Sequence, residues 1–170
     1  GGDLLALIGP LGSGKTCFVR GLASGLGIDE AAVSSPTFII CQEYPPPGND
    51  PQALTLAHVD AYRLADPLEL ETVGWEELLE TPNLVIAVEW ADRIDQALPA
   101  ERIELVFEHV DEDHRAITMA APASMDLRLQ GLSEQVRALS GGRCPICGAQ
   151  VHPAAKSLPF CSDRCRLVDL

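Results

Sequence analysis

The sequence contains few basic residues, and this scarcity argues against direct binding of nucleic acid. It has 12 lysine and arginine residues against 25 aspartate and glutamate residues, which gives a net charge of −13. The imbalance lies in the first 140 residues, which carry −15, whereas residues 141–170 carry +2. Because contacts with a phosphate backbone require lysine and arginine, we expect the main part of the chain to bind neither RNA nor DNA directly.

The sequence also lacks an apolar run of the roughly 20 residues that a membrane-spanning helix requires. It begins at Gly1 without a methionine and has no basic segment that leads into an apolar stretch, so we expect a processed chain or a fragment and no secretion signal. Hydrophobic residues make up 46% of the composition, which is enough for a core. These features predict a soluble, cytoplasmic protein without membrane contact.

Cysteine occurs six times, in two different settings. Cys17 and Cys41 stand alone in apolar surroundings, and we expect both to be buried as small hydrophobic residues. The other four form two close pairs near the end of the chain. Without a secretion signal, such pairing favours metal binding over disulfide bonds.

Short apolar runs that end at a glycine or a carboxylate predict buried strands, and they alternate with segments of helical spacing. The predicted strands are 3–8, 38–44, 53–60 and 84–89, and 102–110 with 115–121 form an edge hairpin. The predicted helices are 15–26, 66–80, with a candidate break at Gly74, and 125–139. This order predicts an α/β fold with a mostly parallel sheet flanked by helices, in which ligands bind at the carboxyl ends of the strands.

Residues 9–16, GPLGSGKT, match the phosphate-binding pattern G-x-x-x-x-G-K-[ST] and lie between a predicted strand and a predicted helix. Backbone N–H groups of such a loop surround phosphates, the lysine reaches the β- and γ-phosphates, and the hydroxyl binds Mg²⁺. A chance glycine-rich turn is the alternative, and the flanking elements argue against it. The predicted nucleotide-binding residues are Gly9, Leu11, Gly12, Ser13, Gly14, Lys15 and Thr16.

Two further predicted strands end in carboxylates, LTLAHV at Asp60 and LVIAV at Glu89. Both should emerge at the edge that holds the phosphate loop, where they and Thr16 are candidate Mg²⁺ ligands. One carboxylate could hold the metal while the other orients or activates water, and the sequence leaves open which does which. Thr37, in the loop SSPTF, is a candidate switch residue. The predicted catalytic set is Lys15, Thr37, Asp60 and Glu89.

Five motifs in one order, GPLGSGKT, SSPTF, HVDAYRL, ELETVGWEELL and VEW, resemble the TsaE family, small bacterial ATPases of tRNA threonylcarbamoyladenosine synthesis. The resemblance runs from about Gly2 to about Ala121. It implies a P-loop NTPase fold, hydrolysis of ATP with Mg²⁺, action on a TsaB–TsaD heterodimer, and only indirect contact with tRNA. It also implies that Lys15 and Thr16 act as the P-loop pair, that Thr37 is the switch-like threonine, and that Asp60 and Glu89 are the site's acids.

Near the end of the chain, a Cys-x2-Cys pair and a Cys-x3-Cys pair supply the ligand set of a closed tetrahedral zinc site. The four predicted ligands are Cys144, Cys147, Cys161 and Cys165. CPICG and PFCSDRC, with the following RLVDL, resemble the YacG family of zinc proteins, which are described as DNA gyrase inhibitors. The resemblance implies a zinc knuckle and a contact with DNA gyrase.

The predicted organisation is therefore an ATPase domain over 1–122, a helical linker over 123–142 and a zinc knuckle over 143–170. Two other functions stay open. A P-loop small-molecule kinase would share the loop and the sheet, but it generally needs an arginine-bearing lid, and the arginines after Arg63 are scattered. Alternatively, the chain is a binding protein whose zinc knuckle inhibits DNA gyrase.

Overall fold

The computed structural model describes residues 3–48, 50–64, 66–111 and 114–125. The chain divides into two units, Gly1–Pro122 and Ala123–Leu170, and the first contains the sheet. The four paired cysteines of the tail, and the predicted helix over 125–139 apart from its first residue, lie outside the described residues. In the described ranges, no helix has both the length and the apolar character needed to cross a membrane.

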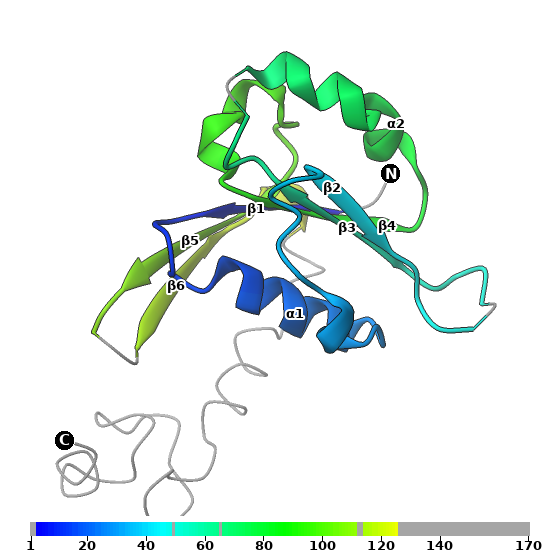
Figure 1. The fold of residues 1–170 in the computed structure, drawn as a ribbon, viewed down its shortest axis with the longest axis horizontal. Coiled ribbons are helices and arrows are strands. Elements are labelled where there is room, and N and C mark those ends of the chain that lie inside the picture. Colours follow the sequence, from blue (N-terminus) through cyan, green and yellow to red (C-terminus); the bar gives the residue numbers. More distant parts are fainter. Residues whose placement is uncertain (1–2, 49, 65, 112–113, 126–170) are drawn as a thin grey trace, which may run out of the picture. The chain divides into compact units, whose positions relative to one another are not determined.

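A mixed sheet of six strands forms the centre of the described part of the chain (Figure 1). The strands are β1 (Leu4–Ile8), β2 (Cys41–Tyr44), β3 (Thr55–Asp60), β4 (Leu84–Glu89), β5 (Ile103–His109) and β6 (Arg115–Ala120). Their order is β2-β3-β4-β1-β5-β6. The four central strands are parallel, and β2 and β6 pair antiparallel at the two edges. The predicted α/β fold and its edge hairpin are thus confirmed.

Helices cover both faces of the sheet, with α1 (Lys15–Gly25) on one and α2 (Trp75–Glu80) on the other (Figure 1). Short 3₁₀ segments complete the connections: η1 (Glu30–Ala32), η2 (Pro67–Val73), η3 (Ala91–Arg93), η4 (Asp95–Ala97) and η5 (Ala123–Met125). Side chains alternate between the faces of a strand, so the central strands β1, β3 and β4 each supply both core layers. Leu56 packs in the layer that contains Val19 of α1, and Val59 packs in the layer that contains Trp75 of α2.

Three predictions from the sequence are corrected by the structure. The strand predicted over 38–44 begins only at Cys41, because the amides of Ile39 and Ile40 both donate to the carbonyl of Pro36 and turn the chain. Ile40 takes a left-handed φ of 67° in this turn. Phe38 is consequently 83% exposed although its sequence context is apolar.

The helix predicted over 66–80 is two segments, the 3₁₀ segment η2 and the helix α2. Gly74 separates them with a left-handed φ of 68°, which confirms the candidate break. Cys17 is exposed and not buried, because α1 turns Val19 and Ala23 toward the sheet and Cys17 lies on a different side of the helix. Cys41 is only partly buried.

The alternation of side chains along β3 and β4 also determines on which face of the sheet the candidate site residues lie. On β3, His58 and Asp60 share the parity of Leu56, and on β4, Glu89 shares the parity of Val85 and Ala87. These residues therefore lie on the face that α1 covers. Asp60 and Glu89 are direct partners in the β3–β4 register, so both carboxylates reach the same end of the sheet.

Candidate nucleotide-binding site

The loop between β1 and α1 has the backbone of an anion-binding turn. Gly12 and Gly14 take left-handed φ values of 74° and 100°, which glycine adopts without the penalty of a Cβ. Gly14 caps α1 without any side-chain hydrogen bond, and the first turn of the helix contains no acidic residue. The first N–H groups of a helix lack intrahelical acceptors and carry the positive end of its dipole. This end of α1 therefore suits a phosphate.

Gly9 lets the loop lie directly against β5. Its φ is 153°, and a Cβ at this position would stand 2.6 Å from the carbonyl oxygen of Phe107. The close approach leaves no space for a side chain. The start of the loop is thereby fixed to the core of the sheet.

Lys15 is 4% exposed, and its ammonium group is held by neutral partners. Nζ donates to the carbonyls of Gly9 at 2.7 Å and Pro10 at 2.9 Å, and it lies 3.8 Å from the centroid of the Trp90 ring. Burial lowers the pKa of Lys15 below its ordinary value, and the nearby Glu89 opposes this shift, with smaller contributions from other acids. The ammonium charge of Lys15 therefore lies beside the phosphate-binding turn, and its two carbonyl acceptors compensate for its desolvation only in part.

Trp90 directly follows β4 and takes a left-handed φ of 59°. Such a conformation costs a non-glycine residue about 1–3 kcal/mol, and it persists where the surroundings impose it. Here the indole forms one wall of the site: Tyr62 packs on it with ring centroids 5.0 Å apart, and Lys15 lies over its face. Tyr62 and Trp90 thus form one side of the site.

Glu89 joins β4 to the phosphate-binding loop. Its Oε1 accepts a hydrogen bond from the Thr16 hydroxyl at 2.7 Å and lies 2.9 Å from Nε2 of His58. His58 is 0% exposed and Glu89 is 3% exposed. Of the two carboxylates that the sequence predicts as metal ligands, Glu89 is therefore the one in contact with the P-loop hydroxyl.

Asp60 has a different set of partners, all in the loops at the end of β3. Its Oδ2 accepts hydrogen bonds from the hydroxyls of Ser35 and Thr37, the latter at 2.6 Å, and its Oδ1 accepts one from the amide of Tyr62 at 2.9 Å. Asp60 therefore fastens the loop that contains Ser35 and Thr37 to the end of the sheet.

These side chains surround a cavity of about 390 Å³. Its lining residues are Leu11, Gly12, Ser13, Gly14, Lys15, Thr16, Ser35, Thr37, Asp60, Tyr62, Glu89 and Trp90. Gly9, which is not part of the lining, contributes its carbonyl to Lys15. The structure thus gathers the residues that the sequence predicts for nucleotide and magnesium.

The donors in this cavity fit Mg²⁺ together with a phosphorylated ligand. In the described part of the chain, no group of three or more His, Cys, Asp and Glu side chains is close enough to hold a metal without help. Mg²⁺ takes few protein ligands and completes its octahedron with waters and phosphate oxygens. A hydroxyl from Thr16 and carboxylates from Glu89 and Asp60 meet that requirement.

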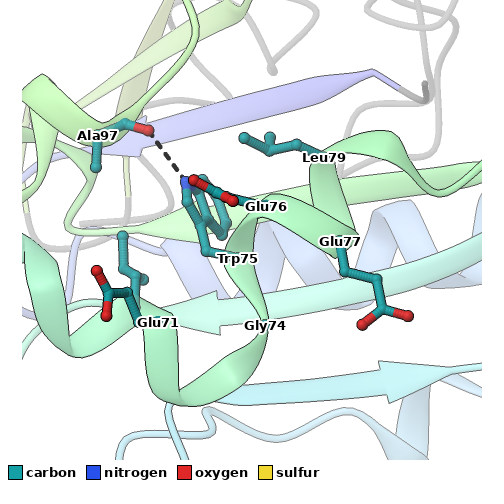
Figure 2. A pocket seen from close by; sticks show the side chains of 8 residues that line it. Glu71, Gly74, Trp75, Glu76, Glu77, Leu79 and Ala97 are labelled. Carbon is teal, nitrogen blue, oxygen red and sulfur yellow. Dashed lines mark hydrogen bonds between the residues drawn. The ribbon is translucent and has the colours of Figure 1, made fainter.

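A larger cavity of about 650 Å³ lies on the other face of the sheet, beside α2 (Figure 2). Its lining residues are Leu70, Glu71, Gly74, Trp75, Glu76, Glu77, Leu79 and Ala97. Figure 2 shows the indole of Trp75 donating to the carbonyl of Ala97, at 3.0 Å, with glutamates around it. Three carboxylates without a basic side chain disfavour a phosphate, so size alone does not identify the site.

Four residues of the site are absent from the predicted nucleotide-binding, catalytic and metal-binding sets: Ser35, His58, Tyr62 and Trp90. Ser35 lies in the loop from which the sequence singles out Thr37 alone. His58 precedes Asp60 by two positions, so the period of a strand places both on one face. That spacing is the signal by which the sequence could have identified His58.

Comparison with known proteins agrees with this geometry. The family model described as threonylcarbamoyl adenosine biosynthesis protein TsaE matches residues 1–117, and the model described as DNA gyrase inhibitor YacG matches residues 142–170. The TsaE protein of Bacillus subtilis is 44% identical over 120 residues, which cover 71% of this chain and 70% of that protein. The TsaE protein of Streptomyces coelicolor is 39% identical over 135 residues, which cover 79% and 83%.

Among solved structures, Bacillus subtilis YdiB superimposes with a TM-score of 0.59 at 35% sequence identity, and the match covers 79% of each chain. The fold is therefore that of a P-loop NTPase, and the residues matched by the TsaE model include the phosphate-binding loop and both carboxylates. The TsaE family model covers most of the chain, and two TsaE proteins are 39–44% identical to it. Both findings support the same family assignment. The chain belongs to the TsaE family, whose members are named for tRNA threonylcarbamoyladenosine biosynthesis.

Proposed function

We propose that this protein is an ATPase that serves tRNA threonylcarbamoyladenosine synthesis by hydrolysing Mg-ATP and acting on a TsaB–TsaD heterodimer. It would reach tRNA only through that partner, since its main part is strongly acidic. The observation that carries the proposal is the hydrogen bond from Thr16 to Glu89. It joins the hydroxyl of a phosphate-binding loop to a carboxylate at the end of a neighbouring strand, which is the combination that Mg-nucleotide chemistry requires.

The nucleotide phosphates bind the loop amides of residues 9–16 and the start of α1. Thr16 and Glu89 are the proposed Mg²⁺ ligands, and the ion when bound would neutralise phosphate charge and polarise the phosphorus–oxygen bonds. Lys15 leaves the carbonyls of Gly9 and Pro10 for the β- and γ-phosphates, an exchange that its partly compensated charge favours.

Glu89 and Asp60 have different hydrogen-bond partners, and we assign them different roles on that basis. Glu89 keeps Thr16 in position from the metal side of the cavity. Asp60, which already holds Thr37, orients the attacking water and accepts its proton on a carboxylate oxygen. Thr37 thereby couples its loop to the state of the γ-phosphate.

The tail forms a separate module in this proposal. The ATPase domain spans 1–122, a helical linker spans 123–142, and the residues from 143 to 170 bind one structural zinc ion through Cys144, Cys147, Cys161 and Cys165. The thiolate set and its spacing support zinc, and the match to a family described as DNA gyrase inhibitors supports a second partner for this module. The protein acts in the cytoplasm, where tRNA is modified.

The test is multi-turnover threonylcarbamoyladenosine synthesis reconstituted with TsaB, TsaD and their other pathway partners. We expect Lys15→Ala to reduce ATP hydrolysis about a hundredfold or more, because it removes a charged donor to the transferring phosphoryl group. Only the intact chain should sustain synthesis beyond the first round. Glu108→Ala, a change of an exposed side chain on β5, is the matched control and should behave like the unmodified protein.

The circular dichroism spectrum of Lys15→Ala must match that of the unmodified chain, which shows that the variant is folded. If the variant folds and hydrolyses ATP normally, the cavity is not the catalytic site. If the intact chain transfers phosphate to a metabolite and not to water, it is a kinase and the proposal is wrong.

A further inference from the structure

His58 is the buried polar residue of the site that the proposed function does not use. It lies in β3 with 0% exposure, and its Nε2 lies 2.9 Å from Oε1 of Glu89 on the neighbouring strand β4. The β3–β4 register pairs His58 with Ala87 and Asp60 with Glu89, so the ring reaches diagonally toward the strand end. An imidazole in this position contacts the carboxylate from inside the core.

The surroundings of the ring determine where its proton is. A carboxylate oxygen accepts hydrogen bonds, so Nε2 must carry a hydrogen to bond with Glu89. The other nitrogen, Nδ1, is buried and has no hydrogen-bond partner among the described residues. A hydrogen on Nδ1 would be a buried donor without an acceptor, which is costly. Nε2 is therefore the nitrogen that donates to Glu89.

Glu89 receives two hydrogen bonds on the same oxygen. The Thr16 hydroxyl donates to Oε1 at 2.7 Å, and His58 donates to it at 2.9 Å. Neither bond uses Oε2. One donor comes from α1 and the other from β3, so the carboxylate is held from two sides by elements that the core makes rigid.

We propose that His58 is a positioning residue that orients Glu89 for the reaction. By occupying Oε1 together with Thr16, it leaves Oε2 as the oxygen with which Glu89 acts in the cavity. The role rests on the proposed function in one respect, that Glu89 works on Mg-ATP. His58 acts through Glu89, in the manner in which buried partners orient ligating side chains in metal sites.

Two substitutions in the full-length chain separate positioning from simple core packing. In His58→Gln, the amide nitrogen of the new side chain reaches about as far as Nε2 and can donate to Glu89. In His58→Asn, the new side chain is shorter, and its amide nitrogen corresponds to Nδ1. Both variants remove the ring and introduce an amide, so they are matched in polarity and differ in reach.

The measurements are steady-state ATP hydrolysis over a range of Mg²⁺ concentrations, ADP binding by calorimetry, and thermal unfolding. We expect His58→Asn to lower kcat by about tenfold or more, the usual effect of losing a partner that orients a metal ligand, while KM for ATP changes little. His58→Gln should recover most of kcat. Equal kcat in His58→Asn and the unmodified chain would overturn the proposal, and so would a loss of kcat in both variants that follows a matching loss of stability.

A spectroscopic readout keeps this test distinct from that of the proposed function. In ¹⁵N NMR spectra of the imidazole, we expect a hydrogen on Nε2 of His58, the nitrogen that donates to Glu89. An Nε2 without a hydrogen would overturn the proposal, even in a chain that hydrolyses nothing. If the ring has the expected form and the unmodified chain does not hydrolyse ATP, then the proposed ATPase function is wrong while the orientation of Glu89 by His58 stands.

Discussion

At the residue scale, partial burial changes the acid–base chemistry of Cys41. Desolvation, with a smaller repulsion from Glu43, raises the pKa of the Cys41 thiol from 9.0 to about 11. Cys17 is exposed on α1. The two cysteines that look alike in the sequence are therefore expected to differ in reactivity, because the thiolate is the reactive form.

The raised pKa of Cys41 predicts a dependence of stability on pH. The folded state holds the thiol proton up to about pH 11, whereas the unfolded chain releases it near pH 9. Stability from this group is thus fully present below pH 9 and is lost as pH rises toward 11. We expect the free energy of unfolding of the unmodified chain, minus that of Cys41→Ser, to fall across this range in urea titrations.

Subtracting the two free energies of unfolding cancels the contribution of all other titrating groups, because both proteins contain them. A difference that stays flat between about pH 8 and about pH 11 would contradict the prediction. Alkylation followed by peptide mass spectrometry provides an independent check, with Cys17 modified well before Cys41.

At the scale of the element, the phosphate-binding loop depends on its contact with β5. Gly9 stands where a Cβ would meet the backbone and side chain of Phe107, and its φ of 153° suits glycine alone. Gly21, in the middle of α1, has no atom within 4 Å of a hypothetical Cβ. Substitution by alanine should therefore change the stability in opposite directions at Gly9 and Gly21.

We expect Gly9→Ala to destabilise the protein by about 1–3 kcal/mol, through strain and displacement of the loop from β5. Gly21→Ala should stabilise it by about 0.4–1 kcal/mol, because alanine restricts the unfolded chain and fits a helix. Urea titrations of both variants measure these changes, and ADP affinity should fall in Gly9→Ala only. Equal free energies of unfolding for the two variants would show that the close approach of Gly9 to Phe107 does not contribute to stability.

At the scale of the whole molecule, the acidic first 140 residues and the cysteine-bearing tail differ in charge and in composition. The first 140 residues carry −15 and the last 30 carry +2. Among the described residues, those that line the nucleotide site come from the first 90 positions. The two modules should therefore lose their activities separately.

We expect one zinc ion per full-length chain and none in the double variant Cys144→Ser/Cys147→Ser, because two remaining thiolates cannot close a tetrahedral site. ATP hydrolysis should be unchanged in that variant. Elemental analysis by mass spectrometry measures the metal, and Cys17→Ser/Cys41→Ser is the matched control that should keep it. Loss of ATP hydrolysis together with zinc would show that the tail serves the nucleotide site after all.

Much of the fold follows from local patterns, because the interactions that form them are local. The apolar runs that end at Gly9, Asp60 and Glu89 predict strands, and the structure has strands at each. The phosphate-binding motif sits between its predicted strand and helix. The strand prediction for 38–40 is wrong, because a turn at Pro36 overrides the β propensity of these apolar residues.

The amino-acid sequence was sufficient for most of the elements, the phosphate-binding loop and the two acids at the ends of neighbouring strands, since periodicity and motif spacing are properties of short segments. Which acid meets which partner emerged only from the folded chain. Glu89 reaches Thr16 and His58, and Asp60 reaches Ser35 and Thr37. Those contacts join residues that are 23 to 73 positions apart, and they depend on the strand order β3-β4-β1, which places the three strand ends side by side.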